Sequence, residues 1–421
     1  MTYQYTSEIA IIGSGPAGCA ASFFLSKDKM SHLIFDKDVF PRDKICGDGL
    51  SPKVIHVMRK FDTSILEQMA ADPIHFAPCY GGHAVSPNGG ELTININKVR
   101  GTASNIAPGY ITRRYDFDYF LTKQINPDFA TVLHGAKVTS LTRLNGGVEI
   151  EYQKDGQTYH AFAKTLIAAD GDRSIVKKTF APSKMEPKHY CAGIRAYYKN
   201  VKGMDTSKNL LEFHFINTIL PGYFWIFPLP DGSANVGVGM ISHDVSKNKV
   251  NLKEVMLHAI QNEPHLKDRF ADAVLEDKIV GWGLPLGSKL GTLSGENFML
   301  TGDAGSFIDP ISGEGIGNAF YTGMLAAQAI AKAKQENVAC DTAFLKIHYD
   351  KRVARTMGME LKFSTFFQKV AHYPRLLNFI VRRASRNKAF MESAEAIFND
   401  EFYKKLLNPI FAFRLAIGFF R

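Results

Sequence analysis

Three glycine-containing turns, far apart in the sequence, carry the residues best suited to chemistry. The first is IIGSGPAG at residues 11–18, the second is ADGDRS at residues 169–174, and the third is TGDA at residues 301–304, followed by DPISGEG at residues 309–315. Glycine lets the backbone turn tightly and approach a phosphate group, so that main-chain N–H groups can bind it. One such turn is a weak signal, but three in this order predict a site for a dinucleotide.

The first turn has the context that dinucleotide binding requires. The largely apolar pattern of residues 8–12 predicts a short buried strand. The small residues after Gly18 continue a predicted helix whose N-terminus would face the phosphates. A second predicted strand, residues 32–35, ends at Asp36, the position from which a carboxylate binds the adenosine ribose. The predicted contacts from this region are Gly13, Gly15, Ala17, Gly18, Asp36 and Lys37. A glycine turn without a ligand is the weaker interpretation beside a strand, a helix and an acid.

The composition is that of a globular protein. The chain has 421 residues, of which 45% are apolar and 22% are charged, enough for a large core and two or three lobes. The five cysteines are widely spaced and form no C-x-x-C pair, so neither a disulfide framework nor a zinc site is expected. No basic segment followed by an apolar one stands at the N-terminus, so we expect no signal peptide and a cytoplasmic location.

The net charge of +9 is concentrated near the C-terminal end, where residues 361–421 contain an excess of seven positive charges. The longest apolar stretch there, residues 409–420, is shorter than the ~18 to 20 residues of a membrane span and contains Arg414. The basic and aromatic residues of this tail either contact an anionic membrane at its inner face or pack on the main domain, and both remain open. No nucleic-acid motif accompanies the charge, so nucleic acid is not an expected partner.

The pattern along the chain predicts a discontinuous organisation. Apolar strands lead into the second and third turns, and residues 178–283 alternate between apolar and polar, which is typical of antiparallel strands. We predict an α/β fold with these parts: a dinucleotide-binding domain of residues 1–76, 101–177 and 284–340, a substrate-binding sheet domain of residues 77–100 and 178–283, and a helical region of residues 341–421.

Three further segments match a known pattern. Residues 114–121 read RYDFDYFL, residues 41–50 read PRDKICGDGL, and residues 223–228 read YFWIFP. Together with the turns, they resemble the geranylgeranyl reductase group within the para-hydroxybenzoate hydroxylase type of flavoproteins, with its elements R-x-x-F-D-x-x-L, P-R-x-K-x-C-G-G-G-L and Y-x-W-x-F-P. The resemblance spans residues 9 to about 331 and implies a Rossmann-like FAD-binding lobe with an inserted mixed-sheet substrate domain. Asp48 departs from it, since it stands where the group has glycine and would place a charge beside the flavin.

The resemblance implies roles for particular residues. It assigns flavin contacts to Arg42, Cys46, Gly47, Arg114, Asp170, Gly171, Gly302, Asp303, Gly313, Gly315 and Ile316. Free N–H groups of Gly313, Gly315 and Gly317 at a helix start would stabilise negative charge on the reduced flavin. Asp303 either contacts the cofactor, as the resemblance implies, or simply caps its own turn. Cys46, near Lys44, is a catalytic proton donor, a steric element beside the flavin, or a small buried apolar residue.

Tyr223, Trp225 and Phe227 alternate along one predicted strand, so all three face the same side. That side is domain core or the wall of an apolar tunnel, and the resemblance favours a tunnel for substrate. An isoprenoid chain would gain roughly 0.8 kcal/mol for each buried CH₂ group there. No metal-ligand spacing is present, and no metal is predicted.

The predicted function is FAD-dependent reduction of carbon–carbon double bonds in an isoprenoid (geranylgeranyl) lipid or a prenyl diphosphate, by hydride transfer from reduced flavin. NAD(P)H or a small redox protein would supply the electrons. One alternative is a monooxygenase (hydroxylase) or halogenase of the same fold, although halogenases usually show W-x-W-x-I-P where this chain has YFWIFP. The other alternative is a flavin-containing lipid-binding protein without catalysis.

Overall fold

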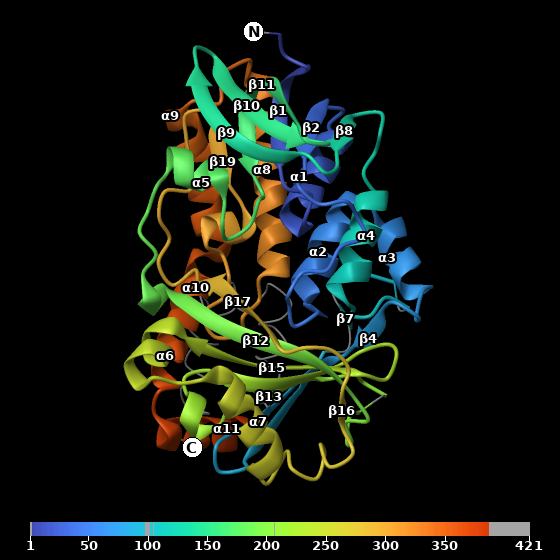
Figure 1. Cartoon of the computed structure of the whole chain (residues 1–421), viewed down its shortest axis with the longest axis vertical. Helices are drawn as coiled ribbons and strands as arrows, with labels where there is room; N and C mark the ends of the chain where they lie inside the picture. Colours follow the sequence, from blue (N-terminus) through green and yellow to red (C-terminus); the bar gives the residue numbers. More distant parts are fainter. Residues whose placement is uncertain (1, 97–101, 104, 206, 387–421) are drawn as a thin grey trace. The chain divides into compact units, whose positions relative to one another are not determined.

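A computed structural model of the chain describes residues 2–96, 102–103, 105–205 and 207–386. The fold divides into two units, each assembled from separate segments (Figure 1). The first unit comprises Met1–Lys44, Arg114–Met185 and Leu284–Leu361, and the second comprises Ile45–Arg113, Glu186–Gly283 and the segment from Lys362 onward. The three-domain limits given above stay a prediction.

The first unit is built on a mainly parallel sheet. Its strands follow the order β18-β19-β11-β1-β2-β8, and β10 and β9 continue antiparallel from β11. Their bounds are β1 Tyr5–Ile12, β2 His32–Phe35, β8 Ala130–Leu133, β9 Lys137–Leu144, β10 Gly147–Lys154, β11 Gln157–Ala168, β18 Ser294–Gly295 and β19 Phe298–Leu300. Because β1, β2, β11 and β19 run parallel, their carboxyl ends meet at one edge, where ligands bind in such sheets. The three glycine turns begin at this edge.

Helices cover this sheet. Their bounds are α1 Pro16–Lys27, α4 Arg114–Lys123, α5 Ile175–Phe180, α8 Ile316–Glu336 and α9 Thr342–Leu345, with a short 3-10 turn at Gly302–Gly305. A Cβ built on Gly323 of α8 would lie 2.2 Å from the carbonyl oxygen of Ala17. The backbones of α1 and α8 are therefore in direct contact, which only glycine at this position permits.

Two faces of the sheet are buried differently. On one face, side chains such as Ala10, Leu166 and Leu300 pack with Val148 of β10 and Val176 of α5 in one apolar cluster. On the other face, α1 and α8 lie against each other and α1 against β1. Burial on both faces explains the continuous apolar runs of these strands.

The second unit contains a larger mixed sheet and a small one. The larger has the order β16-β12-β15-β14-β13-β5-β6, with β17 also pairing with β12, and the smaller is β3-β7-β4. The strands are β3 Gly49–Leu50, β4 Ala77–Cys79, β5 Gly81–Val85, β6 Glu91–Asn95, β7 Gly109–Ile111, β12 Tyr190–Lys199, β13 Leu211–His214, β14 Tyr223–Pro228, β15 Ala234–Ile241, β16 Val274–Leu275 and β17 Val280–Pro285. The predicted antiparallel pairing is confirmed for β12, β13, β14 and β15.

The helices of the second unit are α2 Pro52–Phe61, α3 Thr63–Ala70, α6 Ser242–Asn248, α7 Leu252–Asn262 and α11 Pro374–Ala384. The boundary between the two units falls within α10 Lys351–Val370. A π-helical turn at Lys346–Asp350 precedes α10. The predicted C-terminal helices are thus present as far as Ala384. The apolar stretch at residues 409–420 lies outside the described residues.

Candidate active site

Two glycines of the first turn occupy positions that a side chain would not fit. Gly13 has φ +97°, and a Cβ built on it would lie 2.4 Å from the carbonyl oxygen of Ala169. A Cβ on Gly18 would lie 1.9 Å from the carbonyl oxygen of Gly13. The first of these distances shows that the first and second turns touch through their backbones, so their relative position is set without side chains.

Gly15 differs from its neighbours because it faces open space. The only described atom within 4 Å of a Cβ built there, apart from adjoining residues, is Nη2 of Arg42 at 3.8 Å. Gly15 directly precedes α1, which begins at Pro16, and no side chain caps this end of the helix. Uncapped N–H groups at a helix N-terminus attract anions. The opening beside Gly15 therefore suits a phosphate group, with the Arg42 guanidinium as its counter-charge.

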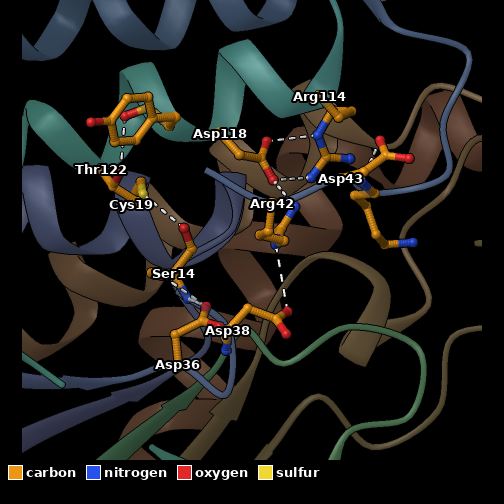
Figure 2. A network of polar contacts seen from close by, with 11 residues as sticks. Ser14, Cys19, Asp36, Asp38, Arg42, Asp43, Arg114, Asp118 and Thr122 are labelled. Atoms are coloured by element: carbon orange, nitrogen blue, oxygen red, sulfur yellow. Dashed lines mark hydrogen bonds and ion pairs between the residues drawn. The ribbon is translucent and has the colours of Figure 1, made fainter. Parts of the chain in front are cut away.

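Asp36 reaches back to the first turn from the end of β2. Its carboxylate accepts hydrogen bonds from the N–H and the hydroxyl of Ser14, both at 2.7 Å, and from the N–H of Asp38 at 2.9 Å (Figure 2). Asp36 is buried, whereas the next residue, Lys37, is exposed. The predicted ribose ligand is thus also a residue that shapes the turn.

A fully buried carboxylate joins the two arginines predicted to contact the cofactor. Asp118 accepts hydrogen bonds from Nε and Nη2 of Arg114 at 2.6 and 2.7 Å, and it forms an ion pair with Nη1 of Arg42 at 2.6 Å (Figure 2). Burial alone would raise the pKa of the Asp118 carboxyl, but the two guanidinium groups hold it below its usual value. Asp118 therefore holds Arg42 in place beside the open side of Gly15.

The second turn offers a carboxylate oxygen without a partner. Oδ2 of Asp170 accepts the N–H of Ile175 at 2.7 Å, whereas Oδ1 is buried and receives no hydrogen bond from the described residues. Burial raises the pKa of Asp170 to about 6. Gly171 follows with φ +78°, and no atom lies within 4 Å of a Cβ built on it. A buried acceptor next to open space suits a ligand that brings its own donor.

Gly302 places the third turn against the first helix. A Cβ built on Gly302 would lie 3.3 Å from Cβ of Ala17 and 3.2 Å from Cβ of Ala319. The carboxylate of Asp303, the next residue, accepts no hydrogen bond from the described residues, and burial raises its pKa while nearby cations lower it less. The three turns therefore meet at the N-terminal ends of α1 and α8, as a single shared ligand requires.

The start of α8 differs from the prediction. Of the three glycines expected to present free N–H groups, Gly313 donates to the carbonyl oxygen of Asp309 and Gly317 donates to the carboxylate of Glu314 at 2.6 Å. Gly315, which precedes the helix without a side-chain cap, donates to none of the described residues. Local capping by the loop, which glycine spacing does not reveal, explains the difference. Gly315 remains the glycine with an available N–H group.

In the second unit, Tyr223, Trp225 and Phe227 lie on the same side of β14, as their spacing predicts. They share one apolar cluster with Ala77, Cys79, Ile111, Tyr197, Leu211, Phe213 and Leu229. Trp225 pairs across the sheet with Gly237, where a Cβ would lie 2.2 Å from the indole ring. Gly237 therefore makes room for the indole. The role of this aromatic surface as a substrate wall stays a prediction.

The segment that contains Cys46 lies on this aromatic surface. A Cβ built on Gly47 would lie 3.1 Å from the ring of Phe227 and 3.8 Å from Nε1 of Trp225. The carbonyl oxygen of Cys46 accepts a hydrogen bond from Nδ2 of Asn235 at 2.7 Å. Two segments that the resemblance connected only by pattern are thus in contact within one unit.

Asp48 follows in the same segment and is fully buried. Its φ of +67° is a conformation that glycine adopts more readily than aspartate, which explains why glycine suits this position. Its Oδ2 accepts hydrogen bonds from the hydroxyl of Tyr197 at 2.8 Å and from Nδ2 of Asn235 at 2.7 Å. The carboxylate is therefore bonded inside the second unit.

Comparison with known proteins gives consistent relatives. A family model described as the geranylgeranyl reductase catalytic domain matches residues 192–276, which lie in the second unit. A menaquinone reductase of Mycobacterium tuberculosis is 28% identical over 343 residues, which cover 78% of each chain. A digeranylgeranylglycerophospholipid reductase of Methanococcus vannielii is 27% identical over 372 residues, which cover 86% of this chain and 87% of that one.

Solved structures agree with these relatives. A geranylgeranyl bacteriochlorophyll reductase-like protein of Thermoplasma acidophilum has a TM-score of 0.78 at 23% identity, covering 96% of this chain and 99% of that one. The chain thus resembles the geranylgeranyl reductase family in the sequence of residues 192–276, and it shares the fold of a geranylgeranyl reductase-like protein. A flavin-dependent brominase also shares the fold, with a TM-score of 0.76 at 21% identity and 94% of each chain covered. Because its relatives are reductases, this protein is an oxidoreductase.

The described residues show neither a membrane span nor a metal cluster. None of their helices has the length and apolarity needed to cross a bilayer. Nor do they contain a group of three or more His, Cys, Asp or Glu side chains placed to hold a metal ion.

Some residues of the site were not predicted from the sequence. Asp118 lies four residues after Arg114 in the recognised R-x-x-F-D-x-x-L element, so its helical spacing was an available signal. Ser14 lies inside the first turn, but its bond to Asp36 has no local signature. Tyr197 and Asn235 come from neighbouring strands of the larger sheet, and nothing in the sequence near Asp48 points to them.

Proposed function

We propose that this protein is an FAD-dependent reductase of carbon–carbon double bonds in an isoprenoid substrate, such as a geranylgeranyl lipid or a prenyl diphosphate. The observation that carries the proposal is the meeting of three glycine turns in one cradle: Gly13 touches Ala169, and Gly302 touches Ala17. The relatives support the substrate class, because digeranylgeranylglycerophospholipid and menaquinone, named in two of them, both carry isoprenoid chains.

FAD fits the residues of the cradle. The pyrophosphate would bind at Gly15 and the uncapped end of α1, with Arg42 as counter-charge. Asp36 and Asp303 would accept hydrogen bonds from hydroxyl groups of the cofactor, and Oδ1 of Asp170 is a further buried acceptor. When bound, FAD supplies hydride transfer to carbon.

The second unit would bind the apolar chain of the substrate. The aromatic surface of β14 offers van der Waals contact without polar anchors, and each buried CH₂ group would contribute roughly 0.8 kcal/mol. Cys46 is half-buried beside this surface, where its thiol would either give a proton to the substrate or limit the space for it. In the first unit, the N–H group of Gly315 would stabilise negative charge on the bound cofactor.

Anaerobic mixing tests the proposal. The flavin of the reduced protein should be reoxidised by prenyl lipids in the absence of oxygen, and mass spectrometry should find two hydrogens added per double bond. Reduction of the oxidised protein by NAD(P)H, or by a small redox protein only, would identify the electron donor. A flavin that is reoxidised by oxygen alone, with a product that gains oxygen or halogen, would contradict the proposal.

The second candidate function is that of an oxygen-using flavoenzyme, because a flavin-dependent brominase has the same fold. The same mixing experiment separates the two. A third candidate, a lipid-binding protein that holds FAD without turnover, predicts that neither prenyl lipids nor a co-substrate with oxygen yields a product.

We also propose a reversible contact with the inner face of a membrane. On α10, on α11 and between them, Phe366, Tyr373, Leu376 and Phe379 are 61%, 65%, 41% and 37% exposed. The basic residues of this region include Lys369, Arg375, Arg382, Arg383 and Arg386. Exposed aromatics beside basic residues suit an anionic lipid surface, and the five free cysteines fit a cytoplasmic location. The aromatics Phe411, Phe413, Phe419 and Phe420, to which the sequence prediction also extends, lie outside the described residues.

A further inference from the structure

We propose that Asp48, acting through Asn235, is a positioning residue that holds the indole of Trp225 in one orientation and so determines which apolar chains the aromatic surface of β14 accepts. The inference rests on the proposed function of that surface as a substrate wall. Its four groups, Asp48, Asn235, Trp225 and Tyr197, all belong to the second unit.

Asn235 is the centre of the arrangement. Its Nδ2 donates to Oδ2 of Asp48 at 2.7 Å and to the carbonyl oxygen of Cys46 at 2.7 Å. Its Oδ1 accepts the indole N–H of Trp225 at 2.9 Å. Asn235 and Asp48 are both completely buried, so that water has no access to replace a lost partner.

The chemistry of the partners allows only one orientation of the amide. An indole N–H group can only donate a hydrogen bond, and an ionised carboxylate can only accept one. If the Asn235 amide were turned around, its NH₂ group would face the indole donor and its oxygen would face the Asp48 carboxylate. The carboxylate therefore selects the amide orientation that accepts from Trp225.

The indole has little freedom besides this bond. Trp225 lies against Gly237, where a Cβ would be 2.2 Å from the ring. The rings of Tyr223 and Phe227 have their centroids 6.2 and 6.3 Å from it. The hydrogen bond from the indole N–H then fixes which edge of the indole faces Asn235.

Asp48 itself is held from a second direction. The hydroxyl of Tyr197 donates to the same Oδ2 at 2.8 Å, and the guanidinium groups of Arg113 and Arg195 each lie 4.1 Å from the centre of the Tyr197 ring. These two cations hold the Tyr197 ring whose hydroxyl binds Asp48. An aspartate at φ +67° in place of glycine is thus tied into a network that glycine cannot form.

Indole hydrogen exchange tests the positioning directly. The chain has two tryptophans, so the holoprotein labelled with ¹⁵N-tryptophan gives two indole N–H signals, and Trp282→Phe assigns them. In the Asp48→Gly variant the indole N–H of Trp225 should exchange at least tenfold faster than in the wild type. Asn235→Ala should accelerate the exchange in the same way. The double variant should exchange little faster than either single variant, because both substitutions break the same connection from Asp48 through Asn235 to Trp225.

Substrate selectivity tests the consequence. In Asp48→Gly, the ratio of kcat/KM for C20 over C15 prenyl lipids should fall about tenfold, the discrimination that a shaped apolar pocket provides, while the flavin content stays unchanged. Lys249→Gly is the matched control, because Lys249 is an exposed residue at φ 52° and its replacement relieves backbone strain alone. Unchanged indole exchange or unchanged selectivity in Asp48→Gly would overturn the inference. If the wild type reduces no prenyl lipid, the proposed function fails, and the indole exchange still decides whether Asp48 positions Trp225.

Discussion

The carboxylate of Asp36 accepts both the backbone N–H and the hydroxyl of Ser14, each at 2.7 Å. This contact joins the end of β2 to the first glycine turn. Asp36 is also the residue predicted to bind the ribose of the cofactor. One side chain therefore holds the turn that would bind the pyrophosphate, and it would also recognise the neighbouring part of the same ligand.

Replacing Asp36 by Ala should weaken FAD binding without unfolding the protein. Hydrogen bonds to charged groups contribute about 1.5 to 3 kcal/mol each, so the dissociation constant should rise by about tenfold to a hundredfold. Ser14→Ala removes only the hydroxyl bond and should have a smaller effect. Titration of the apoprotein with FAD measures both. Asp28→Ala, at the exposed C-terminal end of α1, serves as the control and should leave the affinity unchanged.

Two glycines of the first turn should respond to substitution in opposite ways. Gly13→Ala would place a Cβ 2.4 Å from the carbonyl oxygen of Ala169 at φ +97°, so the variant should lose folding stability. Gly15 faces open space, so Gly15→Val should keep the fold and lose FAD. Thermal melting and flavin absorbance measure the two effects. Tightly bound FAD in a well-folded Gly15→Val protein would contradict the proposed phosphate site.

Asp170 should make the apoprotein less stable as pH rises. Burial raises its folded pKa to about 6, above about 3.9 in the unfolded chain. Such a group binds its proton more tightly when folded, so its contribution to stability is complete below the unfolded pKa and is lost as pH rises through the folded value. The change is at most about 3 kcal/mol. The free energy of unfolding in urea should be measured for the wild type and for Asp170→Asn between pH 4 and 7. The variant should become more stable relative to the wild type as pH rises. A difference that stays constant with pH would refute the raised pKa of Asp170.

Trp225→Ala should impair lipid turnover far more than FAD content, because Trp225 lies on the proposed substrate wall and the cradle belongs to the other unit. We expect at least a tenfold loss in kcat/KM for a prenyl lipid, with flavin absorbance per protein unchanged. Equal losses of FAD and turnover would show that Trp225 supports the fold rather than the substrate.

The membrane proposal predicts binding to anionic vesicles that is lost in a double variant of the exposed aromatics. Phe366→Ser with Phe379→Ser removes side chains that are 61% and 37% exposed, so the fold should persist. Co-sedimentation with phosphatidylglycerol vesicles should fall, and salt should weaken the binding of the wild type. Ile74→Ser, at a residue that is 77% exposed on the same unit, is the control. Equal binding by both variants would remove the membrane role from these helices.

What the sequence predicts well is the part of the site that depends on the backbone. Gly13, Gly18 and Gly302 are required by close approach or by positive φ, and such requirements are local, so a turn pattern reveals them. The side-by-side placement of Tyr223, Trp225 and Phe227 follows from strand periodicity in the same way.

What the sequence does not predict depends on partners that the fold brings from elsewhere. Asn235 reaches the Cys46 segment from a strand 189 residues away, and a single hydrogen bond leaves no periodic pattern. The N–H groups of Gly313 and Gly317 were expected to be free, but the path of the loop directs Asp309 and Glu314 toward them. Side-chain capping of this kind depends on loop geometry, which spacing alone does not specify.

The contact between Gly323 and the carbonyl oxygen of Ala17 also orders events during biosynthesis. The ribosome releases α1 early, and the helix that packs on it follows about 300 residues later. A nascent chain that ends before α8 therefore lacks one wall of the cradle, and the small side chains of α1 have no helix to cover them. The proposed cofactor site is therefore complete only in the finished polypeptide, so the chain would have to fold before FAD could bind.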